Sequence, residues 1–383
     1  MLPPKKILIF IDWFLPGYKA GGPIRSIANL TAQLSDEFEF FIISRNSDYL
    51  AKNPYQSVKA NQWVVFTENI NVFYFSDDQL NIRNIKNLVK NTDFDKAYIN
   101  GIYSFYFSLL PVYLLKKTGK KVVVASRGML SEHSFSSKNF KKKMFIFFAN
   151  LTRFYQNVFF HVTNDQERKE VLKLIDNPRG FMIAPNLPPK VINQKPAKRI
   201  KKTATLKLVS IARISIEKNT LYALNVLANA NYEGEIDFDL YGSIYQQEYW
   251  NKCLDIINHL PAHIKVSYKG ELDNQKVAET LSKYHFSFLP SLGENFGHSI
   301  LESLLVGCPV IISDQTPWRN LEEKNVGWDI PLRHKDKFIK TIQYCIDMDQ
   351  GEYNKWSKNA YEFAKAFAND PGLIEQSRRL FAT

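Results

Sequence analysis

Two glutamates lie eight positions apart where an apolar run gives way to a helical pattern, and carboxylates so placed could bind a ligand. They are Glu294 and Glu302, within FLPSLGENFGHSILESLLVGCPVII, residues 288–312. The apolar run at 285–289 predicts a strand, and the apolar spacing that follows predicts a helix over 297–306. We therefore expect Glu294 in the loop at the start of the helix and Glu302 about one turn inside it.

The predicted start of this helix offers a site for an anion. A helix N-terminus presents free N–H groups and a partial positive charge, and glycines let a ligand approach the backbone. The candidate substrate-binding residues of the loop and first turn are Gly293, Asn295, Phe296, Gly297, His298 and Ser299. Because carboxylates accept hydrogen bonds from hydroxyls, a ligand with both phosphates and vicinal hydroxyls, such as a nucleotide sugar, fits this segment. The alternative is that the two carboxylates only complement the helix dipole.

A basic pair follows another predicted strand, at 206–212. Arg213 and Lys218 lie in SIARISIEKN, residues 210–219. The guanidinium is a planar fork suited to phosphate oxygens, and the ammonium is a point charge. Fixed cations here would stabilise the negative charge that builds on a departing diphosphate. The alternative is a solvated pair at a helix start, where the dipole does not favour lysine.

These segments resemble the motifs of a known family. GENFGHSILE fits the E-x7-E pattern of retaining glycosyltransferases with the GT-B fold, the large group called family 4, or glycosyl transferases group 1. Residues 210–219 resemble the family's motif G-R-x4-K-G, with Ala212 and Asn219 in place of the glycines. TPWRNLEEKNVGW, 316–328, resembles a segment of relatives that build bacterial surface polysaccharides. The resemblance covers the second half of the chain well and the first half more loosely.

The resemblance implies an enzyme and roles for its residues. Glu294 would bind the hydroxyls of the donor sugar, Glu302 the ribose, and Arg213 and Lys218 the diphosphate. The implied reaction moves a sugar, with retention of configuration, from a UDP- or GDP-sugar to a glycan or lipid-linked saccharide. Synthesis of a capsule or lipopolysaccharide is the implied setting. The implied enzyme requires no cofactor and no metal.

The elements that must position these residues alternate along the whole chain of 383 residues. Short apolar runs alternate with amphipathic segments, which predicts βαβ units and mostly parallel sheets. We expect an α/β chain with two Rossmann-like, doubly wound domains facing across a cleft, the GT-B fold. The predicted parts are an acceptor-side domain at 1–190, a linker at 191–204, a donor domain at 205–350, and C-terminal helices at 351–383. Relatives pack these last helices back on the first domain.

The first domain contains weaker candidates. Gly21 and Gly22 precede Pro23 at a predicted helix start, where backbone amides could approach a diphosphate. Their spacing is not that of a dinucleotide fingerprint, and a plain loop is the alternative. After the strand at 121–126, where many relatives carry a histidine, Arg127 is a candidate for contacts with the acceptor or the phosphate. His133 is a further candidate, although a lone histidine on a loop is more often incidental.

The net charge of +12 indicates an anionic partner of some kind. Residues 138–160 mix lysines with aromatics, as in a helix lying on an anionic membrane surface, or as in a core helix with a charged first turn. No nucleic-acid module is visible in the sequence. The uncharged run at 98–115 contains Gly101 and Pro111 and is too short to span a membrane. We expect a cytoplasmic protein, with peripheral contact at the inner face of the cell membrane, and three reduced cysteines.

Other functions compete with this interpretation. The Asp-x-Asp pairs at 93–95, 237–239 and 347–349 could suggest a metal, but none is expected beside other acids. A sugar-nucleotide epimerase of the same architecture would need a proton-handling acid and base, and a phosphorylase would need a longer chain. A non-catalytic subunit that binds nucleotide sugars is a third alternative. The presence of both glutamates and both basic residues argues against it.

Overall fold

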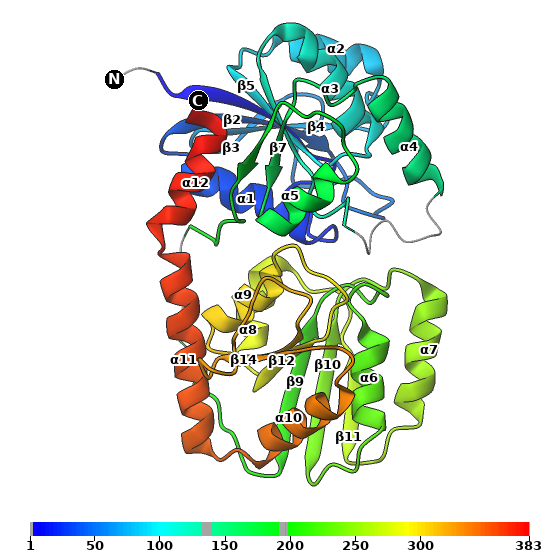
Figure 1. Cartoon of the computed structure of the whole chain (residues 1–383), viewed down its shortest axis with the longest axis vertical. Coiled ribbons are helices and arrows are strands. Elements are labelled where there is room, and N and C mark those ends of the chain that lie inside the picture. Colours follow the sequence, from blue (N-terminus) through cyan, green and yellow to red (C-terminus); the bar gives the residue numbers. More distant parts are fainter. Residues whose placement is uncertain (1–2, 132–139, 191–195, 197, 383) are drawn as a thin grey trace. The chain divides into compact units, whose positions relative to one another are not determined.

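The computed structural model describes residues 3–131, 140–190, 196 and 198–382. The chain forms two compact units, Met1–Lys190 with Asp370–Thr383 and Val191–Asn369 (Figure 1). Each unit is built on its own sheet with helices packed against it, as the alternation of apolar runs and amphipathic segments predicts.

The first unit holds an eight-stranded sheet in the order β3-β4-β2-β1-β5-β6-β7-β8. Its strands are β1 Lys5–Phe10, β2 Phe38–Arg45, β3 Trp63–Thr67, β4 Ile70–Phe75, β5 Lys96–Asn100, β6 Lys121–Ala125, β7 Phe159–Val162 and β8 Gly180–Ile183. The strand β3, which pairs antiparallel with β4, is not predicted from the sequence pattern. This edge strand is half-buried to exposed along its length, so it lacks the fully buried run that marks the central strands.

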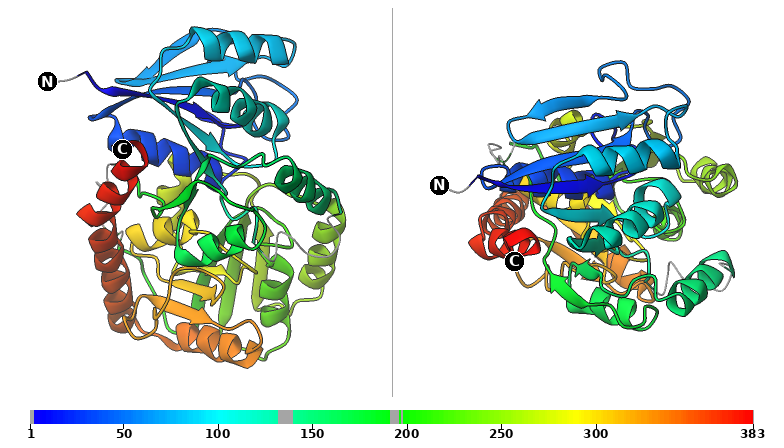
Figure 2. Two further views of the ribbon diagram at one scale, coloured as in Figure 1. Left: turned by 45° about the horizontal axis from the view of Figure 1, so that its top comes forward. Right: turned by 90° about the horizontal axis from the view of Figure 1, so that it is seen from above.

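Helices cover both faces of this sheet (Figure 2). They are α1 Gly22–Leu34, α2 Ile82–Asn91, α3 Leu110–Leu115, α4 Phe140–Leu151, α5 Asp165–Leu172 and α12 Pro371–Ala382. A π-helical turn at Phe105–Leu109 precedes α3. Pro111 has no N–H to donate to the carbonyl of Phe107, and the helical ladder is therefore irregular here.

The last helix, α12, is part of the first unit. Phe381 packs its ring against Phe38 and Tyr98, with centroid distances of 5.5 and 5.8 Å. The ammonium of Lys96 donates to the carbonyl of Phe381 over 2.7 Å, and that of Lys5 to the carbonyl of Ala382 over 2.6 Å. Lysines at the unpaired carbonyls of a helix C-terminus stabilise it. Burial also lowers the pKa of Lys96 to about 8.

The second unit holds a six-stranded parallel sheet in the order β11-β10-β9-β12-β13-β14. Its strands are β9 Thr205–Ile211, β10 Glu235–Tyr241, β11 Ile264–Tyr268, β12 Phe286–Leu289, β13 Val310–Ser313 and β14 Gly327–Ile330. Its helices are α6 Thr220–Ala228, α7 Gln247–Asn258, α8 Val277–Leu281, α9 His298–Leu305, α10 Lys335–Asp347 and α11 Gln350–Ala368. The strands predicted at 206–212 and 285–289 and the helix predicted over 297–306 correspond to β9, β12 and α9.

Part of the predicted linker packs tightly on the second unit. Arg199 is buried and donates to the carbonyls of Val306 and Gly307 over 2.9 and 3.0 Å. Lys201 is buried and donates to the carbonyls of Ile346 and Met348 over 2.9 and 3.0 Å. These carbonyls follow α9 and end α10, where cations are favoured. Composition alone does not reveal these contacts, because it does not show which carbonyls a lysine or arginine will meet.

The strand orders place a topological switch point in each sheet. In the first unit the order reverses between β1 and β5, and in the second between β9 and β12. In open α/β sheets, ligands bind beyond the carboxyl ends of the strands at such a point. The loops after these four strands are therefore where a site is expected.

Candidate functional site

In the second unit, the loops after β9 and β12 are tied together at the switch point. The N–H of Leu292 donates to the carbonyl of Glu217 over 2.9 Å. The amide of Asn219 donates to the carbonyl of Pro290 over 3.0 Å. Asn219 has a φ of 58°, in the left-handed region that asparagine tolerates, which suits it to the place where the family motif has glycine.

An ion pair joins the two loops. The ammonium of Lys218 lies 2.6 Å from Oε1 of Glu294, and the hydroxyl of Ser291 donates to the same oxygen over 2.9 Å. The side chains of Lys218 and Glu294 are 20% and 8% exposed. The sequence analysis found both residues but not their contact. A partly buried pair interacts more strongly than one in water, so the two side chains hold each other in place.

The loop that carries Glu294 is shaped by backbone contacts. The N–H of Glu294 donates to the carbonyl of Gln315 over 2.9 Å. Gly297 is the N-cap of α9 with a φ of 79°, and a Cβ at this position would lie 2.7 Å from Cδ1 of Ile300. Glycine is thus required here. No side chain caps α9, which leaves the first N–H groups of the helix for a ligand.

Some predicted binding residues of this loop have structural tasks. Phe296 is buried, its carbonyl accepts from the indole N–H of Trp318 over 2.6 Å, and the two rings lie 5.6 Å apart. His298 is also buried and lies 4.9 Å from the ring of Phe296. Gly293 is exposed, whereas Asn295 and Ser299 are half-buried. For Phe296, contact with a ligand can come from the backbone rather than the ring.

Glu302 lies one turn inside α9, as predicted. Its neighbours Leu301 and Ser303 are buried, whereas Glu302 is half-buried. Residues three and four apart share a helix face, so Glu302 lies on the side of Ser299 and His298. The second carboxylate therefore lies about one turn from the start of α9, where Glu294 also lies, and it is half-buried.

Arg213 follows β9 and meets an aromatic ring that sequence reasoning missed. Its guanidinium carbon lies 5.5 Å from the ring centroid of Tyr245, in the loop after β10. The N–H of Tyr245 donates to the carbonyl of Ile214 over 3.1 Å, which holds the two loops together. A Cβ on Gly242 would lie 2.0 Å from the carbonyl oxygen of Ala212, so glycine permits this approach.

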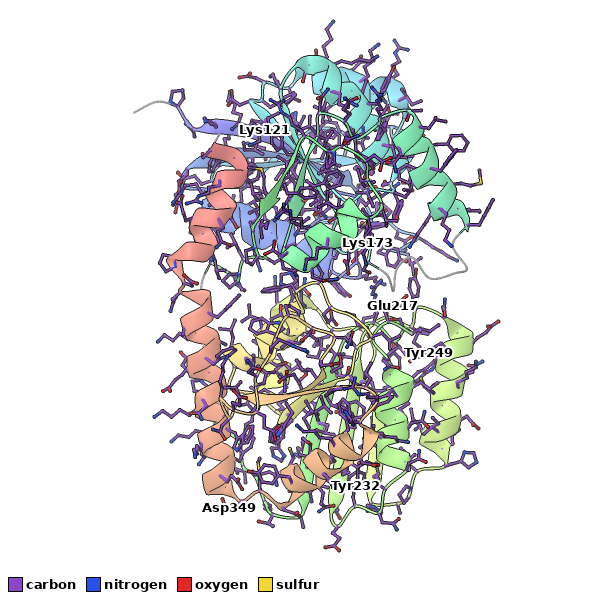
Figure 3. The ribbon with its side chains drawn as sticks, in the orientation of Figure 1. Lys121, Lys173, Glu217, Tyr232, Tyr249 and Asp349 are labelled. Carbon is purple, nitrogen blue, oxygen red and sulfur yellow. The ribbon has the colours of Figure 1, made fainter. Side chains whose placement is uncertain are left out.

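The start of α6 is supported from α7. The N–H of Leu221 donates to the hydroxyl of Tyr249 over 2.9 Å. Burial raises the pKa of this hydroxyl to about 12. Tyr249 and Glu217, the residue before Lys218, lie at the same end of the unit (Figure 3). The loop that carries Lys218 is therefore braced from α7 as well as from the loop after β12.

In the first unit, the diglycine loop has a different support. Gly21 is the N-cap of α1 with a φ of 71°, and no side chain caps this helix. The preceding loop is held by the buried carboxylate of Asp48, which accepts from the N–H groups of Tyr18 and Lys19. The helix α1 begins at Gly22, one residue before the predicted start at Pro23. The first N–H groups of α1 are thus presented by a fixed loop.

Arg127 lies beyond the end of β6, where its guanidinium is held by three partners. It donates to Oδ1 of Asn100 over 2.7 Å, to Oδ1 of Asn186 over 2.5 Å, and to the hydroxyl of Tyr98 over 2.8 Å. These partners come from β5 and from the segment after β8. The contacts give Arg127 a structural task across the carboxyl edge of the sheet, and its predicted contact with a substrate stays a prediction.

The Arg127 network continues into the core through a histidine. The hydroxyl of Tyr98 and Nδ1 of His161 are 2.6 Å apart, and Nε2 of His161 lies 2.8 Å from the carbonyl of Ala184. Because a carbonyl only accepts, Nε2 carries the proton and Nδ1 accepts from Tyr98. Burial lowers the pKa of His161 to about 3 and raises that of Tyr98 to about 12. Both groups are therefore neutral at pH 7.

A buried glutamate that the sequence analysis missed fixes the loop around Arg127. Glu167 accepts from the hydroxyl of Ser126 and the N–H of Gly128, over 2.6 and 2.7 Å. Its other oxygen accepts from the N–H and the hydroxyl of Thr163, over 2.7 and 2.9 Å. Glu167 lies in the first turn of α5 and looks in sequence like any acidic residue at a helix start.

At the first unit's switch point, Asp12 follows β1. Its Oδ1 accepts from the hydroxyl of Ser104 over 2.7 Å and lies 3.9 Å from the guanidinium of Arg45. Burial raises the pKa of Asp12 from its ordinary value. Sequence reasoning passed over this residue, because a single aspartate after a strand has no distinguishing pattern.

The remaining predictions concern a histidine, metals, cysteines and membrane spans. His133 lies outside the described residues. Within residues 3–131, 140–190, 196 and 198–382, no three His, Cys, Asp or Glu side chains gather as a metal site requires. Cys253, Cys308 and Cys345 are free and buried. Among the helices of those same residues, none has the length and apolar character needed to cross a membrane.

Comparison with known proteins shows which family the second unit matches. Residues 191–363 match the family model of Glycosyl transferases group 1. A curated relative, poly(glycerol-phosphate) alpha-glucosyltransferase of Bacillus subtilis (strain 168), is 28% identical over 224 residues. The match covers 55% of this chain and 30% of that protein, so the chain spans about a third of the length of the relative.

Solved structures show the same fold over the full length. Anabaena Alr3699/HepE in complex with UDP and glucose has a TM-score of 0.71 at 14% identity, covering 99% of both chains. Sucrose-phosphate synthase from Thermosynechococcus elongatus has a TM-score of 0.69 at 14% identity, covering 98% of both. WaaG, a glycosyltransferase involved in lipopolysaccharide biosynthesis, has a TM-score of 0.64 at 12% identity, covering 98% of both. These structures show that the chain has the GT-B fold. The match to Glycosyl transferases group 1 covers the second unit.

Proposed function

We propose that the protein transfers a sugar from a nucleoside diphosphate sugar to a hydroxyl of a glycan or lipid-linked saccharide. The observation that carries the proposal is the ion pair of Lys218 and Glu294 beside the uncapped start of α9. One ligand that offers a diphosphate and sugar hydroxyls would use all three features together. The matched family and the UDP complexes of a structural neighbour support this choice of donor.

In the proposed complex, each group of the site has one task. Lys218, Arg213 and the first N–H groups of α9 bind the diphosphate. Both hydrogen bonds described for Glu294 reach Oε1, so Oε2 is assigned to the hydroxyls of the donor sugar. Glu302 binds the ribose, from its position one turn further along α9. The contact of the Gly21 and Gly22 backbone with a diphosphate stays a prediction.

The proposed reaction breaks the bond between the anomeric carbon and the β-phosphate oxygen. An acceptor oxygen bonds to the same carbon, with retention of configuration, and its proton passes to the departing nucleoside diphosphate. Lys218 and Arg213 stabilise the charge that develops on the diphosphate. Because Lys218 is already held by Glu294, little reorganisation is needed when the donor arrives.

The acceptor is assigned to the first unit. The named activity of the Bacillus subtilis relative supports a polyanionic glycan or polyol chain as acceptor. A surface polysaccharide pathway and a site of action at the inner face of the cell membrane stay predictions.

A thermal-shift experiment tests the donor site directly. We expect one of the UDP-, GDP- or ADP-sugars to raise the melting temperature, because a ligand that binds the folded state stabilises it. Lys218→Met and Glu294→Gln should abolish the shift. The matched controls are Lys283→Met and Glu279→Gln, which break an exposed ion pair of 2.8 Å in the same unit and should leave the shift intact.

Two outcomes would contradict the proposal. One is that no nucleotide sugar changes the melting temperature. The other is that Lys218→Met and Glu294→Gln respond as the control variants do. If a donor binds but is neither transferred nor hydrolysed, the protein is a nucleotide-sugar-binding subunit. If the sugar is recovered still linked to its nucleotide, with the configuration inverted at one ring carbon, the protein is an epimerase.

A further inference from the structure

Helix α4 presents an apolar face to solvent. Five large apolar side chains on this helix are between 42% and 71% exposed: Phe140, Met144, Phe147, Phe148 and Leu151. With about 100° between successive residues, all five fall within an arc of about 100° on one side of the helix. We call them the α4 apolar face. Ile146 and Ala149 on the opposite side are buried in the core of the first unit, so the helix is already anchored without this face.

An exposed face of this kind is unusual for a helix at the edge of an α/β unit (Figure 1). A surface helix ordinarily has one apolar side and one polar side, whereas α4 is apolar on both. Contiguous exposed apolar patches mark contacts with a protein or a membrane. We therefore expect the α4 apolar face to bind a partner, and the charges around it indicate what kind of partner that is.

Lysines border the α4 apolar face on both sides. Lys141 and Lys143 are exposed, and at about 100° per residue they fall just beyond the two edges of the apolar arc. Lys142, between them, turns toward the unit, with its ammonium 5.4 Å from the ring centroid of Tyr103. Long lysine stems can reach past an apolar surface and leave the charged group at its rim.

The positive charge of the chain is concentrated in the sequence segment that contains this helix. Residues 96–164 contain eleven lysines and arginines against one acid, Glu132, a balance of +10 out of the +12 of the whole chain. A second copy of the chain would bring the same positive charge to the same face, which disfavours self-association. An anionic lipid surface matches both the charge and the apolar side chains.

We propose that the α4 apolar face inserts into the headgroup region of an anionic membrane, with Lys141 and Lys143 binding the lipid phosphates. The apolar side chains enter the boundary between headgroups and acyl chains, as those of interfacial helices do. The interaction is a property of the first unit and does not depend on the chemistry of the donor site. It would bring the enzyme to the surface where a lipid-linked acceptor resides.

Co-sedimentation with lipid vesicles tests the surface. The intact protein is mixed with vesicles of phosphatidylcholine alone or with phosphatidylglycerol, and the partition coefficient is measured. We expect binding to the anionic vesicles that weakens with salt. Phe147→Ser with Phe148→Ser should lower the partition coefficient by about tenfold or more. Lys141→Glu with Lys143→Glu should lower it by at least about fivefold per lysine on anionic vesicles.

The matched control replaces exposed apolar residues elsewhere on the same unit. Ile82 and Leu172 are 52% and 49% exposed, on α2 and α5. Ile82→Ser with Leu172→Ser should leave vesicle binding unchanged, and circular dichroism melts should show that every variant folds. The nucleotide-sugar thermal shift should be the same in all of them, so a failure here is distinct from a failure of the donor site.

Three outcomes would overturn the proposal. The wild-type protein could bind neutral and anionic vesicles equally or not at all. The α4 variants could bind as well as the control variant does. Light scattering could also show a wild-type oligomer that the Phe147 and Phe148 substitutions dissociate, in which case the occupant of the face is a second copy of the chain.

Discussion

Both units place charged side chains beyond the carboxyl ends of their strands, but the two units use them differently. In the second unit, Lys218 and Glu294 contact each other across adjacent loops, with Ser291 as a further partner. In the first unit, Arg127 is held by three partners drawn from two other segments of the sheet edge. A basic residue after a strand is thus not enough to indicate a phosphate site. The difference between Lys218 and Arg127 is how many of the hydrogen-bond donors of each side chain are already bound to other residues of the protein.

Of the effects that follow from comparing Lys218 with Arg127, the largest is expected in the rate of sugar transfer. Lys218→Met should lower kcat/KM by about 10²- to 10³-fold, because it removes a fixed cation from the developing diphosphate charge. Arg127→Met should act mainly through stability, since its partners are internal. Steady-state release of nucleoside diphosphate, together with the melting temperature of each variant, separates the two. A matching loss of rate for Arg127→Met at unchanged melting temperature would place Arg127 at the substrate.

The next effect concerns the buried carboxylate behind Arg127. Glu167→Gln should lower the free energy of unfolding by about 2–4 kcal/mol, because an amide NH₂ would face the N–H of either Gly128 or Thr163. Asp165→Asn on the same helix is the control, with a side chain that is 75% exposed and an expected loss below about 1 kcal/mol. Chemical denaturation measures both. Equal losses would show that the Glu167 contacts do not brace the first unit.

Each unit also contains a buried neutral histidine, and these make folding sensitive to acid. Burial lowers the pKa of His161 to about 3 and that of His285 to about 4. His285 accepts from the N–H of Lys207 over 3.0 Å and lies 3.0 Å from the carbonyl of Ile200. In the unfolded chain both titrate near pH 6.5, so the unfolded state binds more protons below that pH.

The free energy of unfolding should therefore fall as the pH drops below about 6.5, continuing to about pH 4 for His285 and about pH 3 for His161. At pH 5 each histidine should account for roughly 2 kcal/mol. Denaturation at pH 7 and pH 5, with hydrogen exchange to separate the units, should show a smaller loss for His161→Gln and His285→Gln. An unchanged pH dependence in both variants would rule out buried neutral histidines.

The smallest effect is expected at the surface of α12. Arg378 contacts both carboxylate oxygens of Glu37, over 2.6 and 2.7 Å, but the two side chains are 36% and 39% exposed. Arg378→Ala should cost less than about 1 kcal/mol, because exposed pairs contribute little. Hydrogen exchange of α12 measures this. A large loss of protection would mean that the ion pair, rather than the packing of Phe381, holds α12 to the first unit.

Sequence patterns were informative where the signal was local. The parallel strands are short buried apolar runs, and both loops of the proposed donor site could be located from residues close together in the chain. The edge strand β3 and the π-helical turn before α3 were missed, since one lacks full burial and the other depends on a single proline. Arg199 and Lys201 belong to the predicted linker, and the structure shows that both bind helix carbonyls of the second unit.

The sequence by itself determined the alternation of strands and helices, and with it two doubly wound sheets, and the position of Glu294, Glu302, Arg213 and Lys218 at strand ends or helix starts. Only the tertiary structure decided which of these groups meet. Lys218 contacts Glu294 across 76 residues, Arg127 contacts Asn186 across 59, and Glu167 contacts Ser126 across 41. A parallel sheet brings the carboxyl ends of its strands to one edge whatever their separation along the chain. Partners at that edge are therefore chosen by strand order, which no local pattern of residues encodes.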